Sequence, residues 1–144
     1  MAFTNLNRTS TGTSYAFIPQ PDTLGNMISG RELKYDFLLV DFWASWCKPC
    51  RESHPKLKLL YDKYKGGKLE IMSVSLDDNR SEWIQAIRKD KLTWVQVSDL
   101  KGSTLNELAK YYNIAFIPFN ILINKEGKIL ATNIKSTALP GFLK

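Results

Sequence analysis

The sequence contains few of the residues that hold small secreted domains or metal centres together. It has two cysteines in 144 residues, Cys47 and Cys50, and a single histidine, His54. Two cysteines alone cannot form the framework of a disulfide-stapled domain. A structural zinc site needs four ligands, which this set supplies poorly, and covalent haem attachment needs a histidine directly after the second cysteine, where Arg51 stands. We therefore expect neither a metal nor a cofactor.

The sequence also lacks long apolar runs and blocks of one charge. No stretch of about 18 apolar residues occurs, and residues 1–17 lack the basic and apolar parts of a secretion signal. We expect no stable membrane insertion, and either a cytoplasmic location or, if a signal or anchor was trimmed, the bacterial periplasm or cell envelope. The net charge is +6, but lysines and arginines are dispersed as on a solvated surface, so no nucleic-acid partner is expected.

Length and composition are typical of one globular domain. The chain has 144 residues, of which 44% are hydrophobic and 24% charged, and a domain averages roughly 150 residues. Residues 1–13 are rich in Ser, Thr, Asn and Gly, so we expect a flexible segment there, outside the fold. A single monomeric domain is expected over residues 14–144.

The hydrophobic pattern predicts strands that alternate with helices. Residues 37–44 (FLLVDFWA) and 69–76 (LEIMSVSL) are nearly continuous apolar runs, as in strands that are covered on both faces. Helices are predicted to begin at Cys47, at Asn79 and at Thr104, the last two with a glutamate three residues later as a capping pair. The other predicted strands are 94–98, 119–123, 128–132 and one or two short ones within 14–36. This order predicts an α/β fold with helices on both faces of a sheet.

The segment WASWCKPC places both cysteines where a buried strand ends and a helix begins. Unpaired N–H groups and the positive end of the helix dipole favour a thiolate at Cys47, and Lys48 adds positive charge. Cys50 lies one helical turn later, close enough to attack a mixed disulfide formed by Cys47. Pro49 fits the first helical turn, where no intrahelical hydrogen bond is lost. The pattern favours thiol-disulfide exchange, with two inert buried cysteines as the alternative.

Asp41 is the one charged residue within the apolar run 37–44. Burying a carboxylate is costly unless it is paired or useful, and burial would raise its pKa toward that of a general base at neutral pH. A structural aspartate held by hydrogen bonds is the alternative.

The segment VDFWASWCKPC resembles the active-site segment of thioredoxins, and residues 37–133 follow the thioredoxin order of strands and helices. The resemblance also includes Pro55 in the following helix and the pair Ile117-Pro118 just before the penultimate strand. It implies a thioredoxin fold with a central mixed β-sheet flanked by helices. A helix and a strand at about 80–98, absent from a minimal thioredoxin, and extra N-terminal strands resemble the TlpA/ResA-like branch of bacterial envelope reductases.

The resemblance implies a role for each residue of the motif. Cys47 would be the nucleophile, Cys50 the resolving thiol, and Asp41 the carboxylate that handles the proton of Cys50. A cis bond between Ile117 and Pro118 would face the cysteine pair. The residues expected to contact the substrate are Trp46, Lys48, Pro49, Ile117 and Pro118.

Three features depart from the family pattern. Ser73 stands where thioredoxins usually place a lysine near the aspartate, and Phe119 follows the proline in place of a threonine or serine. The closing helix of the family is interrupted at Pro140-Gly141, so a truncated or frayed end is expected.

His54 is expected on the helix surface, and Trp83 and Trp94 are assigned only a packing role.

The function that these features predict is disulfide exchange with protein partners, in the direction of reduction. Its partners would be protein disulfides or dithiols and an upstream thiol reductant. A peroxidase of the peroxiredoxin type would need a hydroxyl residue three positions before the first cysteine, where Ala44 stands. A redox-inert binding module that keeps the scaffold is the other alternative, and the intact cysteine pair argues against it.

Overall fold

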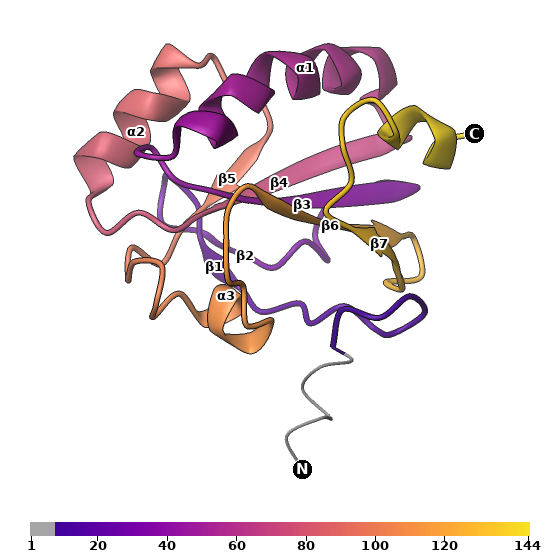
Figure 1. Ribbon diagram of the computed structural model, residues 1–144, viewed down its shortest axis with the longest axis horizontal. Coiled ribbons are helices and arrows are strands. Elements are labelled where there is room, and N and C mark those ends of the chain that lie inside the picture. The colour runs from indigo at the N-terminus through magenta and orange to yellow at the C-terminus, as the bar shows by residue number, and fades with distance from the viewer. Residues whose placement is uncertain (1–7) are drawn as a thin grey trace.

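A five-stranded mixed sheet forms the centre of the molecule (Figure 1). The computed structural model describes residues 8–144. The strands stand in the order β5-β4-β3-β6-β7, with β3, β4 and β5 parallel and with β6 and β7 antiparallel to their neighbours. Their bounds are β3 Phe37–Trp43, β4 Leu69–Ser75, β5 Val95–Val97, β6 Phe119–Asn124 and β7 Ile129–Thr132. The mixed sheet flanked by helices is thus confirmed.

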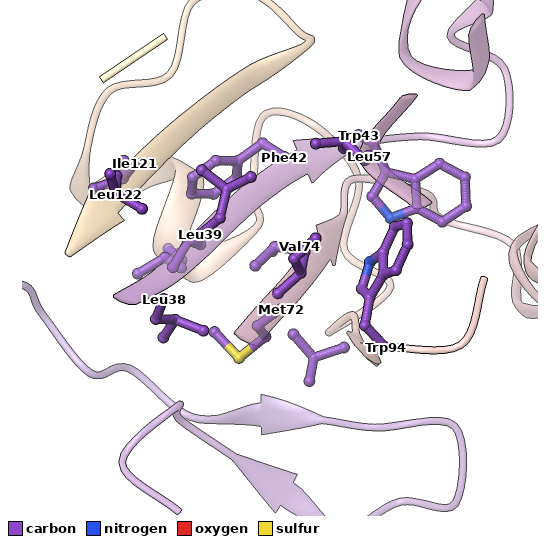
Figure 2. Close-up of a cluster of buried hydrophobic side chains, with 14 of the residues drawn as sticks. Leu38, Leu39, Phe42, Trp43, Leu57, Met72, Val74, Trp94, Ile121 and Leu122 are labelled. Atoms are coloured by element: carbon purple, nitrogen blue, oxygen red, sulfur yellow. The ribbon is translucent and has the colours of Figure 1, made fainter. Parts of the chain in front are cut away.

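Strand β3 lies at the centre of this sheet, between β4 and β6, and both of its faces are covered. Every residue from Leu38 to Trp43 is buried. Helices α1 (Lys48–Tyr64) and α2 (Arg80–Lys89) lie over one face, while α3 (Glu107–Tyr111) and the N-terminal segment lie on the other (Figure 1). The buried side chains of β3 and β4 form one cluster with Leu57 of α1 and with Trp94 (Figure 2).

The insert between β4 and α3 consists of helix α2 and strand β5, as predicted. Asn79 caps α2 by accepting a hydrogen bond from the Glu82 N–H at 3.0 Å. The predicted cap of the next helix was wrong: α3 begins at Glu107, and Asn106 rather than Thr104 caps it. Asn106 is buried and also donates to Gln20, so tertiary contacts fix the start of this helix.

The N-terminal residues that the sequence places outside the fold belong to it, at least from residue 8 on. The Gly12 N–H donates to the Ile129 carbonyl at 2.8 Å, and the Ile129 N–H donates to Thr13 at 2.9 Å. Residues 8–13 therefore pack on the domain, while residues 1–7 lie outside the described part. Backbone hydrogen bonds to β7 hold this polar stretch in place.

The predicted N-terminal strands form a second, two-stranded sheet. Strand β1 (Gln20–Pro21) pairs antiparallel with β2 (Met27–Ile28). This sheet joins the main one near β5, where the Ser98 N–H donates to the Pro21 carbonyl at 3.0 Å.

The C-terminal residues pack onto the domain instead of fraying. A 3₁₀ turn spans Leu139–Phe142, and Leu139 and Leu143 are both buried. The interruption at Pro140 shortens the helix but does not release the chain. No helix within residues 8–144 is long and apolar enough to cross a membrane.

Candidate active site

Cys47 is the N-cap of helix α1. Strand β3 ends at Trp43, and the Cys47 N–H closes the connecting turn by donating to the Ala44 carbonyl at 3.0 Å. Its Sγ accepts a hydrogen bond from the Cys50 N–H at 3.3 Å. Cys47 and Cys50 form a disulfide with their Cα atoms 5.3 Å apart, and both are buried. The strand-to-helix junction therefore holds both sulfurs together at the start of a helix.

The start of α1 is electrostatically suited to a negative sulfur. The helix has 17 residues and no acidic residue in its first turn, so its dipole acts on Cys47 without local opposition. Lys48 and Pro49 are exposed beside the disulfide. A thiolate released at Cys47 would face unpaired backbone N–H groups.

Asp41 lies within β3 and is almost completely buried. Burial raises its pKa from 3.8 to about 7, partly offset by a hydrogen bond from Ser73. The Ser73 hydroxyl donates to Asp41 Oδ2 at 3.2 Å across the pair β3–β4. This is the position at which the sequence departs from the family lysine, so a neutral donor stands in place of a cation.

Asp41 is one of the residues that line a pocket of about 340 Å³. Helix α1 lines it with Ser53, Lys56 and Leu57, and Pro118 lines it from the other side. A group with a pKa near neutrality thus lies at a pocket formed by the cysteine-bearing helix and the proline loop. This is a suitable location for proton exchange with solvent.

The loop before β6 lies beside the cysteine loop. The Ile117-Pro118 peptide bond is cis. Ile117, Phe116 and Trp46 line a second pocket of about 300 Å³, and the Trp46 and Phe116 side chains are 60% and 57% exposed. The structure therefore brings Trp46 and Ile117 to one pocket and Pro118 to the pocket that Asp41 lines, with two large apolar side chains open to solvent.

Asp77 fixes the loop before Cys47 and was not among the predicted site residues. Its carboxylate accepts hydrogen bonds from the Ser45 N–H at 3.1 Å, the Ser45 hydroxyl at 2.6 Å and the Ser75 hydroxyl at 2.6 Å. An available signal was its position directly after the predicted strand 69–76. The carboxyl ends of parallel strands meet at one edge of a sheet, so Asp77 had to lie near the end of 37–43.

His54 is buried, and its predicted place on the helix surface was wrong. Its side chain is 1% exposed, and its Nδ1 lies 2.8 Å from Asp90 Oδ2. Arg51 donates to both oxygens of Asp90, at 3.0 and 2.8 Å, and to the Ser45 carbonyl. Helix α2 covers this side of α1, which turns an outward helix position into an interface. The cysteine loop is thereby tied to the insert.

The described residues offer no metal site. No group of three or more His, Cys, Asp or Glu side chains within residues 8–144 could hold an ion. The chemistry available at this site is that of two sulfurs, a buried carboxyl group and hydrogen-bond donors.

Comparison with known proteins points to one family. Residues 35–129 match the family described as thioredoxin-like. The sporulation thiol-disulfide oxidoreductase A of Bacillus subtilis is 34% identical over 99 residues, which are 67% of this chain and 58% of that protein. The thiol-disulfide oxidoreductase ResA of Bacillus thuringiensis is 29% identical over 109 residues, 76% of this chain and 61% of that protein. The chain thus spans about three fifths of the length of these two relatives.

A solved structure shows the same arrangement over nearly the whole chain. The thiol-disulfide oxidoreductase from Bacteroides fragilis is 40% identical in sequence. The superposition has a TM-score of 0.82 and covers 91% of this chain and 97% of that one.

Proposed function

The chain belongs to the thioredoxin-like family, and on that premise we propose that it is a thiol-disulfide oxidoreductase that reduces disulfides in partner proteins. Its fold is the thioredoxin fold that the resemblance implied. One observation carries the proposal: Cys47 and Cys50 form a disulfide at the N-terminus of a long helix, beside an exposed apolar surface.

The proposed cycle starts from the dithiol form. The Cys47 thiolate attacks one sulfur of the partner disulfide, which forms a mixed disulfide and releases the first partner thiolate. Asp41 accepts the proton of Cys50, and the Cys50 thiolate then attacks Cys47 Sγ. The second partner thiolate leaves, the Cys47-Cys50 disulfide forms, and two electrons have passed to the partner. An upstream dithiol reductant returns the protein to its starting form.

Partner binding is assigned to the two loops around the disulfide. Within residues 8–144 the backbone N–H and C=O of Ile117 make no hydrogen bond. They are available to pair with an extended segment of a partner, as in β-strand addition. Trp46, Lys48 and Pro49 would contact the same segment from the cysteine side, with Pro118 next to the disulfide.

Reduction is the proposed direction because of the negative charge that Asp41 can carry. An ionised Asp41 close to the cysteines opposes extreme stabilisation of a thiolate, which is the property of strong oxidants. We expect a reduction potential near the thioredoxin value of about −270 mV rather than the value of about −120 mV found for the oxidant DsbA. The bacterial cell envelope is the compartment we propose for this reaction, following the resemblance to envelope reductases.

Trapping of mixed disulfides tests the two cysteine roles. We expect Cys50→Ser to accumulate covalent complexes with a disulfide-containing protein, since the first attack remains possible and the release step does not. Cys47→Ser should form none, because Cys50 is 1% exposed and lies inside the helix. Non-reducing electrophoresis with a reducing-gel control measures both outcomes. Equal trapping by the two variants would contradict the assignment.

A further inference from the structure

The insert contacts Asp41 through a chain of two hydrogen bonds. The Trp94 indole Nε1–H donates to Ser73 Oγ at 2.8 Å, and the Ser73 hydroxyl lies 3.2 Å from Asp41 Oδ2. All three side chains are buried. Trp94 is the residue before β5, so this contact is made by the part of the chain that a minimal thioredoxin lacks. Figure 2 shows the Trp94 ring beside Trp43, with its nitrogen turned toward the strand that carries Met72 and Val74.

The chemistry of the three groups fixes which group donates and which accepts in each of the two hydrogen bonds. An indole N–H can only donate, so Ser73 Oγ must act as the acceptor of the Trp94 proton. That bond occupies one lone pair of the hydroxyl and leaves its proton to point at Asp41. A donor held in this orientation stabilises the carboxylate form over the carboxylic acid. Each bond also polarises the next one.

We propose that Trp94 is a positioning residue that holds the Ser73 hydroxyl as a donor to Asp41, and that the insert thereby sets how readily Asp41 takes up the proton of Cys50. The effect on the proton of Cys50 rests on the proposed function, whereas the hydrogen-bond chain itself does not. Trp94 itself touches neither sulfur nor substrate in this role.

The other groups around Asp41 do not replace this donor. Lys56 of α1 and Lys135 after β7 line the same pocket, are exposed, and make no ion pair with Asp41. Asn120 lies opposite Asp41 on β6, but both ends of its amide are bonded to the backbone of Ile134. Ser73 is therefore the one side chain within residues 8–144 that donates to Asp41. The orientation of the Ser73 hydroxyl therefore has a large effect on the pKa of Asp41.

The position of Trp94 is fixed independently of this bond. Its ring packs edge-to-face on Tyr61 at 5.5 Å and against His54 at 6.4 Å between centroids. Replacing it with phenylalanine keeps these contacts and removes the N–H. We expect Trp94→Phe to raise the pKa of Asp41 by about 0.5 to 1 unit, because the serine proton is then free to turn away. Ser73→Ala should raise it at least as much, and adding Trp94→Phe to Ser73→Ala should change nothing further.

The insert supplies a matched control. Trp83 of α2 is equally buried, but its Nε1 has no hydrogen-bond partner. Trp83→Phe therefore removes an indole N–H and similar packing but leaves the hydrogen bonds from Trp94 through Ser73 to Asp41 unchanged. We expect this variant to lose stability but to leave the pKa of Asp41 where it is.

The pKa is measured on the oxidised protein by carbon NMR of labelled aspartate carboxyls, with the Asp41 signal identified by its loss in Asp41→Asn. In the parent protein the indole proton of Trp94 should titrate together with Asp41 and stop titrating in Asp41→Asn, a measurement that needs no tryptophan variant to fold. A shift with Ser73→Ala but not with Trp94→Phe, or equal shifts for the two tryptophan variants, would overturn the proposal.

Activity separates this proposal from the proposed function. If Asp41 serves Cys50, the acid limb of the pH profile for reduction of insulin disulfides moves upward in Trp94→Phe by the same 0.5 to 1 unit, roughly, as the NMR titration. An NMR shift without a change in the profile would support the hydrogen-bond chain and contradict the role of Asp41. If the Asp41 signal does not move, the proposed hydrogen-bond chain is contradicted, whatever the pH profile of activity shows.

Discussion

Two buried aspartates lie near the disulfide, and they differ in the number of donors they receive. Asp77 is 1% exposed and accepts from a backbone N–H and two hydroxyls. Asp41 is 4% exposed and accepts one hydrogen bond, from Ser73, among the described residues. Both carboxylates are removed from water, but only the first recovers most of the hydrogen bonds that water provided.

The difference assigns the two groups to different tasks. Asp77 ties Ser45 to the end of β4 and so fixes the loop that carries Cys47. Asp41 is left short of donors, and burial raises its pKa to about 7. Near neutral pH such a group exchanges its proton at little cost, which a fully bonded carboxylate does not need to do. The donor count thus supports a structural role for Asp77 and the role of proton carrier proposed for Asp41.

The largest expected effect is on the pH dependence of stability in Asp41→Asn. The folded pKa of Asp41 is about 7 and its ordinary value is 3.8. Because the folded state holds a proton that the unfolded state releases, this group makes the protein less stable as the pH rises from about 4 to 7. Asparagine carries no such cost. The variant should gain stability relative to the parent by up to about 4 kcal/mol between pH 4 and pH 8.

Urea unfolding of the oxidised forms across this pH range measures the difference, since the thiols are then absent. Ser73→Ala serves as the companion variant, because it keeps the carboxyl group of Asp41. We expect it to lose more stability than the parent as the pH rises. A stability difference that does not depend on pH would mean that Asp41 is ionised in the fold at all these pH values. The comparison with Asp77 would then fail.

The second effect concerns Asp77. Replacing it with alanine leaves the Ser45 N–H and the Ser45 and Ser75 hydroxyls without their acceptor, and we expect a loss of about 2 to 4 kcal/mol in the free energy of unfolding. Asp78 is the next residue and is exposed, so Asp78→Ala is the matched control and should cost less than about 0.5 kcal/mol. Chemical denaturation of both variants checks this. Similar losses in the two would contradict the anchoring role of Asp77.

The smallest effect is at Asp90, a third acidic group with charged partners. Burial would raise the pKa of Asp90, but hydrogen bonds from Arg51 and His54 outweigh it and lower this pKa. The resulting stability is present above the ordinary aspartate pKa and is lost as the pH falls through the lowered one. Arg51→Lys removes the two-pronged bond and should cost about 1 kcal/mol at pH 7, less at pH 3.

The exposed Arg88, near the same end of α2, supplies the control for this variant. Arg88→Lys should leave the melting temperature unchanged at both pH values. If Arg51→Lys behaves like Arg88→Lys in calorimetric scans, the bonds to Asp90 contribute nothing measurable to stability.

Sequence patterns predicted the strands and the cysteine helix because those signals are local. The apolar run from Phe37 to Trp43 and the junction at Cys47 are each set by a few neighbouring residues. The family resemblance added the proline loop and the role proposed for Asp41. Both kinds of inference depend on residues that are recognisable without knowing their distant contacts.

The errors concern residues whose surroundings come from distant parts of the chain. His54 looked exposed on its own helix, but Asp90 and the two tryptophans that pack on it come from other elements. Thr104 had the sequence of a cap, but a hydrogen bond to Gln20 makes Asn106 the cap. The packing role assigned to Trp94 is confirmed by its burial, but nothing in the sequence indicates which way its N–H points. Tertiary contacts override local preference at such positions.

The N-terminal segment has a consequence for how the domain meets other chains. Residues 12–14 run along β7, where Ser14 pairs with Lys128, and Asp22 pairs with Val97 at β5. One stretch of about ten residues therefore contacts both outer strands of the sheet, the places at which foreign chains can add. Backbone groups remain open at Ile117, in the pocket that Trp46 also lines. In the proposed function, a partner segment would bind at Ile117, while the N-terminal stretch contacts the outer strands at which further strands could add.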